Sequence, residues 1–109
     1  MFPGANLKGQ IMFVVVVEFT VRAEFKEPFL KRVMRQAQDS LQLEVNCHIF
    51  DVCVCSENKN RVLLYEVYTD KTAFDVHLAS AHFRDFSNAV QEWVSDRQLT
   101  TFERLQTGI

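Results

Sequence analysis

The chain has 109 residues, 48% of them hydrophobic, and a formal net charge of −2 at pH 7. This length predicts one domain with a modest core, and the slight acidity argues against nucleic acid or an anionic membrane surface as a partner. The longest apolar run, residues 11–17, ends at Glu18 and is too short to span a membrane. Because no basic segment followed by a long apolar run opens the chain, we predict no signal peptide and a cytoplasmic location.

The first part of the chain predicts a leader, a strand and a helix. Residues 1–11 hold a proline and two of the three glycines, so we expect a flexible leader there. Residues 12–22 are rich in valine and phenylalanine, which is typical of a buried strand. Residues 25–41 then carry apolar residues at spacings of three and four, which predicts an amphipathic helix with Pro28 in its first turn. Its inward face is expected to hold Phe25, Phe29, Leu30, Val33, Met34, Ala37 and Leu41.

The middle of the chain predicts a hairpin. Residues 46–55 alternate in character, which places Cys47 and Phe50 on opposite faces of a strand. A polar turn over residues 56–60 separates this strand from the next, over residues 61–68. The two strands are therefore expected to pair as neighbours in an antiparallel sheet.

A broken helix and a last strand follow the hairpin. Thr69 or Asp70 is expected to cap the helix, and the chain should bend near Ser80, a second candidate N-cap. The last strand is expected over residues 98–105. The inward residues of the stretch between bend and strand are expected to be Phe83, Phe86, Ala89, Val90, Trp93 and Val94.

The predicted order β-α-β-β-α-β defines an α+β, ferredoxin-like protomer in a single domain over residues 12–106. Such a protomer is a four-stranded antiparallel sheet with the helices on one face. The opposite face would expose valines and phenylalanines to water. A second copy of the same sheet is the simplest cover, so we predict a homodimer whose two sheets form a β-barrel.

Polar groups are concentrated where the hairpin leads into the broken helix. Glu66 and Tyr68 share one strand face, since they alternate with the residue between them. His77 shares its helix face with Phe74 and is expected to point toward the sheet. It is either an acid–base group in a pocket or a core histidine bound to a backbone carbonyl or to Glu66. A semi-buried Glu66 would be a usable base, or it would pair with His77 or Arg84.

Further residues complete the candidate pocket. His82 follows the bend at Ser80, where a helix N-terminus favours a bound anion, or it is a capping-region histidine without a ligand. The Tyr68 hydroxyl is a candidate hydrogen-bond donor to an anionic intermediate, or the ring simply packs on Phe74. The rings of Phe50, Phe74 and Phe86 would form the walls of a pocket for an aromatic substrate, or belong to the core.

The cysteines give a weak metal-site pattern. Three cysteines cannot all pair within one chain, and reduced thiols are the simpler interpretation. A site built from Cys47, His48, Cys53 or Cys55 remains an alternative, although this spacing lacks a second Cys/His pair. We predict no metal and no cofactor.

Four short segments, in this order and spacing, resemble the antibiotic biosynthesis monooxygenase domain. They are Val16-Val17-Glu18-Phe19, Ile49-Phe50-Asp51-Val52, Tyr65-Glu66-Val67-Tyr68 and His77-Leu78-Ala79-Ser80-Ala81-His82-Phe83. The resemblance spans about residues 13–105 and implies a dimeric α+β barrel of ferredoxin-like protomers. It implies chemistry on small molecules: oxidation of quinols or phenols by O₂ without metal or flavin, haem cleavage, or isomerisation of carbonyl compounds such as phospho-autoinducer-2.

The haem-degrading branch is disfavoured by two positions. Ser87 stands where the resemblance places the haem-ligating histidine, four residues beyond the position of Phe83, and Tyr68 stands in place of a pocket tryptophan.

The sequence therefore predicts a cofactor-independent monooxygenase acting on a small phenolic, quinol or carbonyl metabolite. His77 or Glu66 is expected to remove a proton, and Tyr68 and His82 to hold the resulting anion. The alternatives are an isomerase of the phospho-autoinducer-2 type and a non-catalytic dimer with a ligand-binding or structural role.

Overall fold

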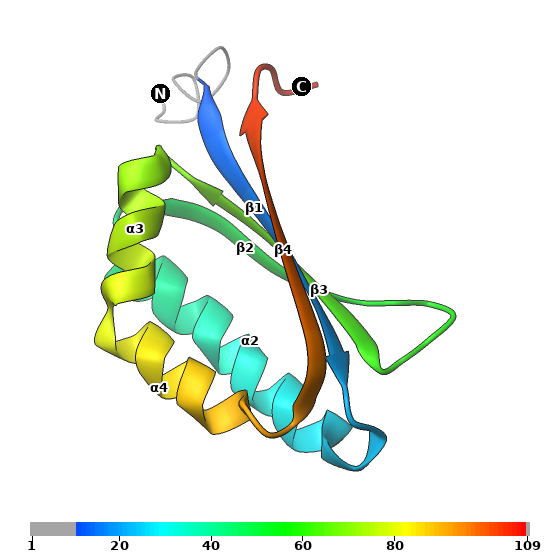
Figure 1. Ribbon diagram of the computed structural model, residues 1–109. Coiled ribbons are helices and arrows are strands. Elements are labelled where there is room, and N and C mark those ends of the chain that lie inside the picture. Colours follow the sequence, from blue (N-terminus) through cyan, green and yellow to red (C-terminus); the bar gives the residue numbers. More distant parts are fainter. Residues whose placement is uncertain (1–10, 109) are drawn as a thin grey trace.

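The computed structural model describes residues 11–108, and it confirms the predicted order of elements (Figure 1). The elements are β1 (Met12–Val21), a 3₁₀ turn (Ala23–Phe25), α2 (Lys26–Leu43), β2 (Cys47–Val54), β3 (Arg61–Tyr68), α3 (Lys71–Ala79), α4 (Ala81–Val90) and β4 (Val94–Arg104). The predicted leader over residues 1–11 lies, apart from Ile11, outside the described residues. No helix within residues 11–108 is long and apolar enough to cross a membrane; the cytoplasmic location stays a prediction.

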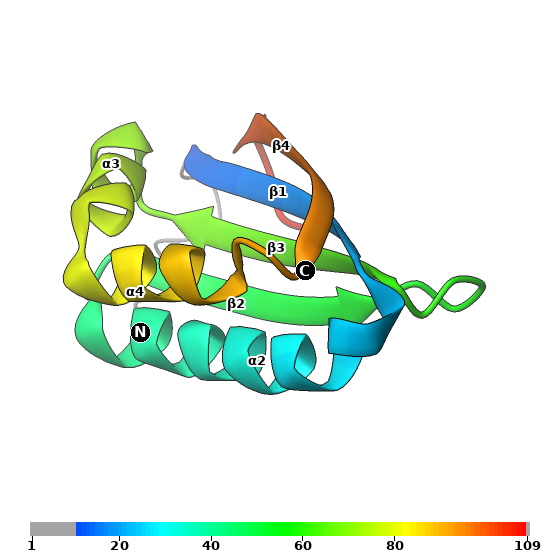
Figure 2. The same ribbon diagram turned by 60° about the horizontal axis from the view of Figure 1, so that its bottom comes forward.

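The four strands form one antiparallel sheet in the order β2-β3-β1-β4. The central strand β1 pairs with β3 on one side and β4 on the other, so Val15 stands opposite both Glu66 and Thr101. Helices α2 and α4 lie along one face of this sheet, and α3 covers one end (Figure 2). The ferredoxin-like α+β fold predicted from the sequence is confirmed.

The main core lies between the sheet and the helices. Val15, Val17 and Phe19 point to this side from β1 and meet Phe29 and Val33 of α2, all at most 6% exposed. The Phe19 and Phe29 rings meet edge to face with centroids 5.3 Å apart, an arrangement that adds to the burial of the rings. Alternation along β1 therefore decides which side chains the helices cover.

A second, smaller apolar cluster lies on the opposite side of the sheet, which we call the helix-free face. Met12, Val14 and Val67 are buried there, and Phe102 stands beside Val14 in the β1–β4 ladder with 53% of its surface exposed. The partly buried side chains that pack on this cluster are Val16, Ile49 and Tyr65. The predicted apolar character of this face is confirmed.

Two positional predictions in the first half of the chain are wrong. Cys47 lies in the main core together with Phe50, because a bulge between Cys47 and Ile49 shifts the β2 register. On α2, Met34 and Leu41 are 51% and 45% exposed, while Gln36 and Ser40 are buried. The buried face of the helix thus includes this polar pair: Gln36 Nε2 donates to Ser40 Oγ, and Ser40 Oγ donates to the Gln36 carbonyl.

The transition into the last strand also differs from the prediction. Helix α4 ends at Val90 and β4 begins at Val94, whereas we expected helix through Val94 and a strand from residue 98. A backbone hydrogen bond from Trp93 N–H to the Val90 carbonyl closes a turn there. The Trp93 carbonyl then accepts from Arg22 N–H, so the chain pairs with the end of β1 four residues early.

The break between α3 and α4 is made by Ser80. Its Oγ accepts a hydrogen bond from Phe83 N–H at 3.2 Å and donates to the His77 carbonyl at 2.7 Å. The same side chain thus closes the end of α3 and caps the start of α4. The predicted bend is confirmed, and it brings His77 and His82 together with ring centroids 5.7 Å apart.

Replacing this cap should destabilise the protein measurably. We expect Ser80→Ala to lower the free energy of unfolding by about 1–2 kcal/mol, because loss of an N-cap side chain costs this much. Ser56→Ala, in the exposed hairpin turn, is the matched control and should stay within about 0.5 kcal/mol of the wild type. Urea titration followed by circular dichroism measures both; equal midpoints for the two variants would contradict the assigned role of Ser80.

Candidate active site

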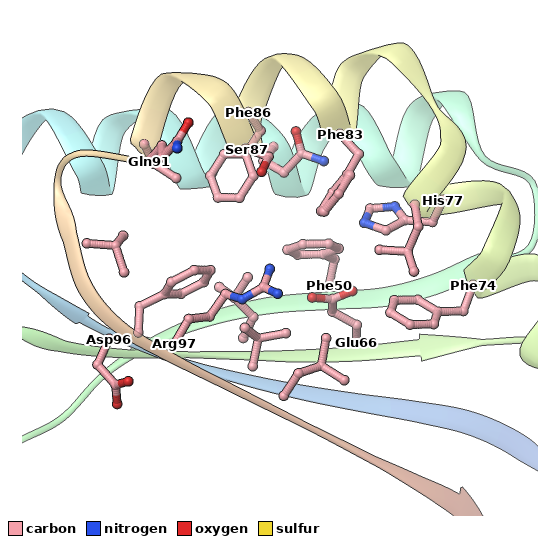
Figure 3. Close-up of a pocket in the computed structure, with 18 of the residues that line it drawn as sticks. Phe50, Glu66, Phe74, His77, Phe83, Phe86, Ser87, Gln91, Asp96 and Arg97 are labelled. Carbon is pink, nitrogen blue, oxygen red and sulfur yellow. The ribbon is translucent and has the colours of Figure 1, made fainter.

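A cavity of about 770 Å³ lies between the sheet and the helices (Figure 3). All four strands and all three α-helices contribute lining residues. The volume falls in the range that holds small organic ligands. The predicted pocket between helices and sheet therefore exists.

Phenylalanines form a large part of the cavity wall. The three predicted wall residues, Phe50, Phe74 and Phe86, all line it, and Phe19 and Phe83 add two further rings. Phe50, Phe74 and Phe86 are at most 7% exposed, so they belong to the core and face the cavity at the same time. A cavity with this lining fits a flat apolar or aromatic molecule.

His77 is held at one end of the cavity by a carboxylate that the sequence did not point to. Its Nδ1 lies 2.7 Å from Oε2 of Glu44, at the C-terminal end of α2, and the two side chains are 3% and 9% exposed. Figure 3 shows the imidazole pointing into the cavity. An ionised carboxylate can only accept a hydrogen bond, so beside it Nδ1 is the donor and Nε2 is left with its lone pair. The alternative partners, Glu66 or a backbone carbonyl, are not the ones found.

His82 contacts the same carboxylate from another helix. It is the second residue of α4, and its Nε2 lies 2.7 Å from Glu44 Oε2. Its Nδ1 lies 3.1 Å from Nε2 of Gln36, which is 1% exposed. His82 does not line the cavity. The structure thus brings His82 next to His77 but behind it, rather than beside the space for a substrate.

Glu66 and Tyr68 form a second buried polar pair. They share the helix-covered face as predicted, at 3% and 0% exposed, and the Tyr68 hydroxyl donates to Glu66 Oε1 at 2.6 Å. Burial raises the pKa of the Glu66 carboxyl from its ordinary 4.5 to about 7, against the opposing effects of this hydrogen bond and of His77. Burial and the neighbouring carboxylate raise the pKa of Tyr68, so its hydroxyl remains a donor. Glu66 lines the cavity, whereas Tyr68 lies behind it.

Several polar residues at the cavity were not found from the sequence. Ser87 lines it from α4, Gln91 from the residue after α4, and Asp96 and Arg97 from the start of β4 (Figure 3). The two β4 residues were missed because the strand was expected to begin at residue 98. Glu44 was missed because it follows the predicted helix and its partners come from 33 and 38 residues away in sequence, which no local pattern encodes. Arg84, a predicted alternative partner of Glu66, donates instead to the Ala79 carbonyl.

The cysteine-based metal site considered for the sequence is not formed. Within residues 11–108 the metal-ligand types come together in one group of three, and it contains none of Cys47, His48, Cys53 or Cys55. Cys47 is buried in the main core, and burial raises the pKa of its thiol to about 12. Cys53 is exposed. These thiols therefore do not form a shared ligand set.

The family follows from a comparison of the sequence with family models. The model of the antibiotic biosynthesis monooxygenase family matches residues 12–89. The chain belongs to this family. No curated protein matches the chain. Ser87 of this chain lines the cavity, so the position that the sequence resemblance assigned to a haem-ligating histidine carries a serine.

Solved structures share the fold over nearly the whole chain. A candidate antibiotic biosynthesis monooxygenase from Nitrosomonas europaea is 23% identical, with a TM-score of 0.83 over 86% of this chain and 90% of that one. A second one, from Caulobacter crescentus CB15, is 17% identical, with a TM-score of 0.84 over 96% and 100%. A conserved protein from Methanosarcina mazei Go1 is 19% identical, with a TM-score of 0.82 over 89% and 96%. These likenesses establish the fold.

The raised pKa of Glu66 should appear in the pH dependence of stability. Between pH 4.5 and about 7 the folded protein keeps a proton that the unfolded chain has released, so the free energy of unfolding falls as pH rises through this window. A pKa shift of this size corresponds to a loss of about 3 kcal/mol in the free energy of unfolding once the pH lies above the window. In Glu66→Gln this contribution should vanish, while the amide oxygen still accepts from Tyr68.

Denaturant titrations of both proteins at several pH values measure the difference. The wild type should lose stability relative to Glu66→Gln as pH rises from about 4.5 to 7 and then remain at a constant offset. A difference that does not change with pH would show that Glu66 titrates at its ordinary value.

Proposed function

We propose that this family member is a cofactor-independent monooxygenase that oxidises a small phenolic or quinol metabolite with O₂. The observation that carries the proposal is the Glu44–His77 pair at the end of a phenylalanine-walled cavity. A carboxylate-oriented imidazole is a strong general base at neutral pH, and deprotonation is the step that makes a phenol reactive toward O₂. Substrate class and mechanism are inferences from this geometry.

His77 takes the first proton. Nδ1–H is held by Glu44 at 2.7 Å, so Nε2 faces the cavity as the acceptor. When Nε2 receives the substrate proton, the imidazolium stands next to a carboxylate that stabilises it, as in other paired acid–base sites. The surrounding rings of Tyr68, Phe74 and Phe83, with centroids 5.1 to 6.0 Å from the imidazole, exclude water and fix its orientation.

The oxidation balances with O₂ as the only co-reactant. A hydroquinone, once deprotonated, transfers electrons to O₂; one oxygen atom forms a new C–O bond on the ring and the other leaves as water. The organic product is a hydroxyquinone, and the four electrons that the hydroquinone loses are the four that reduce O₂. The proton held by His77 is released to the departing water.

Glu66, Tyr68 and His82 support this step in different ways. Glu66 faces the cavity with a pKa of about 7, so it serves as a second group that gives or accepts a proton. Tyr68 holds Glu66 by a hydrogen bond, and His82 contacts Glu44. Because neither Tyr68 nor His82 lines the cavity, we assign them as positioning residues rather than as direct anion holders.

The second acid–base group favours an isomerase as the alternative. An isomerisation requires one group to remove a proton and a group to return it to a neighbouring atom, and His77 with Glu66 supplies such a pair. Both reactions begin with the same proton abstraction. They differ in whether O₂ is consumed, so a small hydroxyketone converted without O₂ would identify the isomerase.

Turnover of a panel of quinols and hydroxyketones, with oxygen uptake recorded in parallel, tests the assignment. His77→Ala should lower kcat/KM by about 100-fold or more, the usual effect of losing a general base. His48→Ala is the matched control, because His48 lies on the edge strand β2, bonds Thr69 and does not line the cavity; it should retain wild-type turnover.

Two outcomes would overturn the enzymatic proposal. The first is unchanged turnover in both His77→Ala and Glu66→Gln. The second is tight binding of aromatic compounds in the cavity with no chemical conversion, which would identify a ligand-binding protein.

We further propose that two chains associate through the helix-free face. Phe102 is 53% exposed on this face, and Val16, Ile49 and Tyr65 are only partly buried there, so apolar sheet surface remains accessible and is expected to be covered. The barrel formed by two such sheets is what membership of the family leads us to expect.

Sedimentation at micromolar concentration should therefore give a dimer. Phe102→Asp should shift it toward the monomer, because a charge placed in an apolar interface is costly. Val76→Asp, a change at a 60% exposed position of α3 away from that face, should leave the dimer intact. A monomeric wild type, or equal effects of the two variants, would disprove the interface.

A further inference from the structure

Three metal-ligand side chains converge at the ends of three helices. Glu44 is the C-cap of α2, His77 lies in the last turn of α3, and His82 lies in the first turn of α4. Their ligand atoms all lie within 4.8 Å of one another, and no other group of this kind occurs in residues 11–108. We propose that Glu44, His77 and His82 form a binding site for a divalent transition-metal ion, with Zn²⁺ as the best-suited ion.

The two distances that involve Glu44 require only a small adjustment for a metal. Nδ1 of His77 and Nε2 of His82 are each 2.7 Å from Oε2 of Glu44. Ligand atoms about 2.0–2.1 Å from a tetrahedral zinc stand about 3.3 Å apart. A retreat of the Glu44 carboxylate by roughly half an ångström opens this space.

A buried ring nitrogen of His82 that lacks a hydrogen-bond partner also supports a metal site. Its Nε2 is fully buried and close to the carboxylate oxygen, yet the direction of the contact is unsuitable for a hydrogen bond, and this nitrogen has no other partner among the described residues. A buried nitrogen without a partner is costly. A metal ion between the three side chains would satisfy it, since a lone pair on Nε2 would then point to a cation.

Gln36 supplies the supporting contact that a metal-bound histidine needs. A histidine that binds metal through Nε2 carries its proton on Nδ1 and donates it to a neighbouring acceptor. The Gln36 amide lies 3.1 Å from Nδ1 of His82, and its Oε1 is buried without a partner. Turning the amide by 180°, which exchanges two atoms of nearly equal appearance, places this oxygen as the acceptor and gives up the long 3.4 Å contact of the Gln36 Nε2 with Ser40 Oγ.

The donor set selects the class of metal. Two imidazoles and one carboxylate suit zinc and its neighbours in the first transition row, whereas calcium and magnesium prefer oxygen ligands throughout. Three protein ligands leave a fourth position for water. The side chains of the three ligands are only 3% to 12% exposed, so the ion would be largely enclosed and would tie the three helix ends together.

Metal binding would also change the proton on His77. Coordination through Nδ1 moves the imidazole proton to Nε2, which faces the cavity, and turns an acceptor into a donor. Occupancy of the site and the use of His77 as a base therefore exclude each other. This consequence rests on the proposed function, whereas binding of the ion itself does not.

The site is tested by titrating the purified full-length chain with Zn²⁺, and separately with Co²⁺ as a spectroscopic probe, at neutral pH without any substrate. We expect one ion per chain, a cobalt spectrum without sulfur-to-metal charge transfer, and a thermal midpoint raised by zinc because the ion binds the folded state. His82→Ala and Glu44→Gln should weaken zinc binding by about 100-fold or more, because even loss of an outer partner of a metal site costs 10–100-fold.

His48→Ala is the matched control and should bind zinc as the wild type does, since His48 lies outside the cluster. Zinc binding that is equal in the wild type and His82→Ala, a cobalt spectrum with sulfur ligation, or no binding at micromolar zinc would each overturn the proposal. The cobalt spectrum of the wild type keeps the test decisive if a variant does not fold. Because no turnover is measured, these results are independent of whether the enzymatic proposal holds.

Discussion

The candidate site depends on an incomplete cover of the sheet by its helices. Alternation along β1 sends Val15, Val17 and Phe19 to the helix side, where α2 packs against β2 and α4. The edge strand β4, in contrast, is exposed from residue 95 to residue 103. The apolar side chains below α4 therefore lack packing partners on the side of β4, and a cavity remains along that strand (Figure 3). Burial that stabilises the core thus also creates the space for a ligand.

Two carboxylates in this apolar region are stabilised in different ways. Glu66 is held by one neutral donor, the Tyr68 hydroxyl, and its pKa rises to about 7 because desolvation outweighs that bond. Glu44 is approached by two imidazoles at 2.7 Å, so its charge has partners that can be positive. An acid–base group with a pKa near neutrality and a carboxylate that orients a histidine therefore lie close together in the same part of the site.

The break at Ser80 links stability to the site. A single continuous helix would place His77 and His82 five residues apart, on different faces of one cylinder. The cap separates them into two helices whose ends meet Glu44 from different directions. His77 can then reach both the cavity and the carboxylate, which makes its nitrogens available to two alternatives, proton transfer at Nε2 and metal coordination at Nδ1. The choice between these states depends on where a single imidazole proton resides.

The sequence by itself determined the elements and most of the cavity wall. Periods of two and of 3.6 identified the strands and helices, and the same patterns placed Phe50, Phe74, Phe86, Glu66 and His77 toward one interior. These results rest on local geometry, because the face of a residue follows from its position within its own element. The family resemblance supported the same assignment.

Only the tertiary structure decided which polar groups meet. Glu44 reaches His77 and His82 from another helix, and the shift of β4 brings Arg97 to the cavity. The bulge that turns Cys47 into the core depends on pairing with β3. Each of these contacts joins residues from separate elements, and its partner is fixed by packing and strand register, which no periodicity within a single segment encodes.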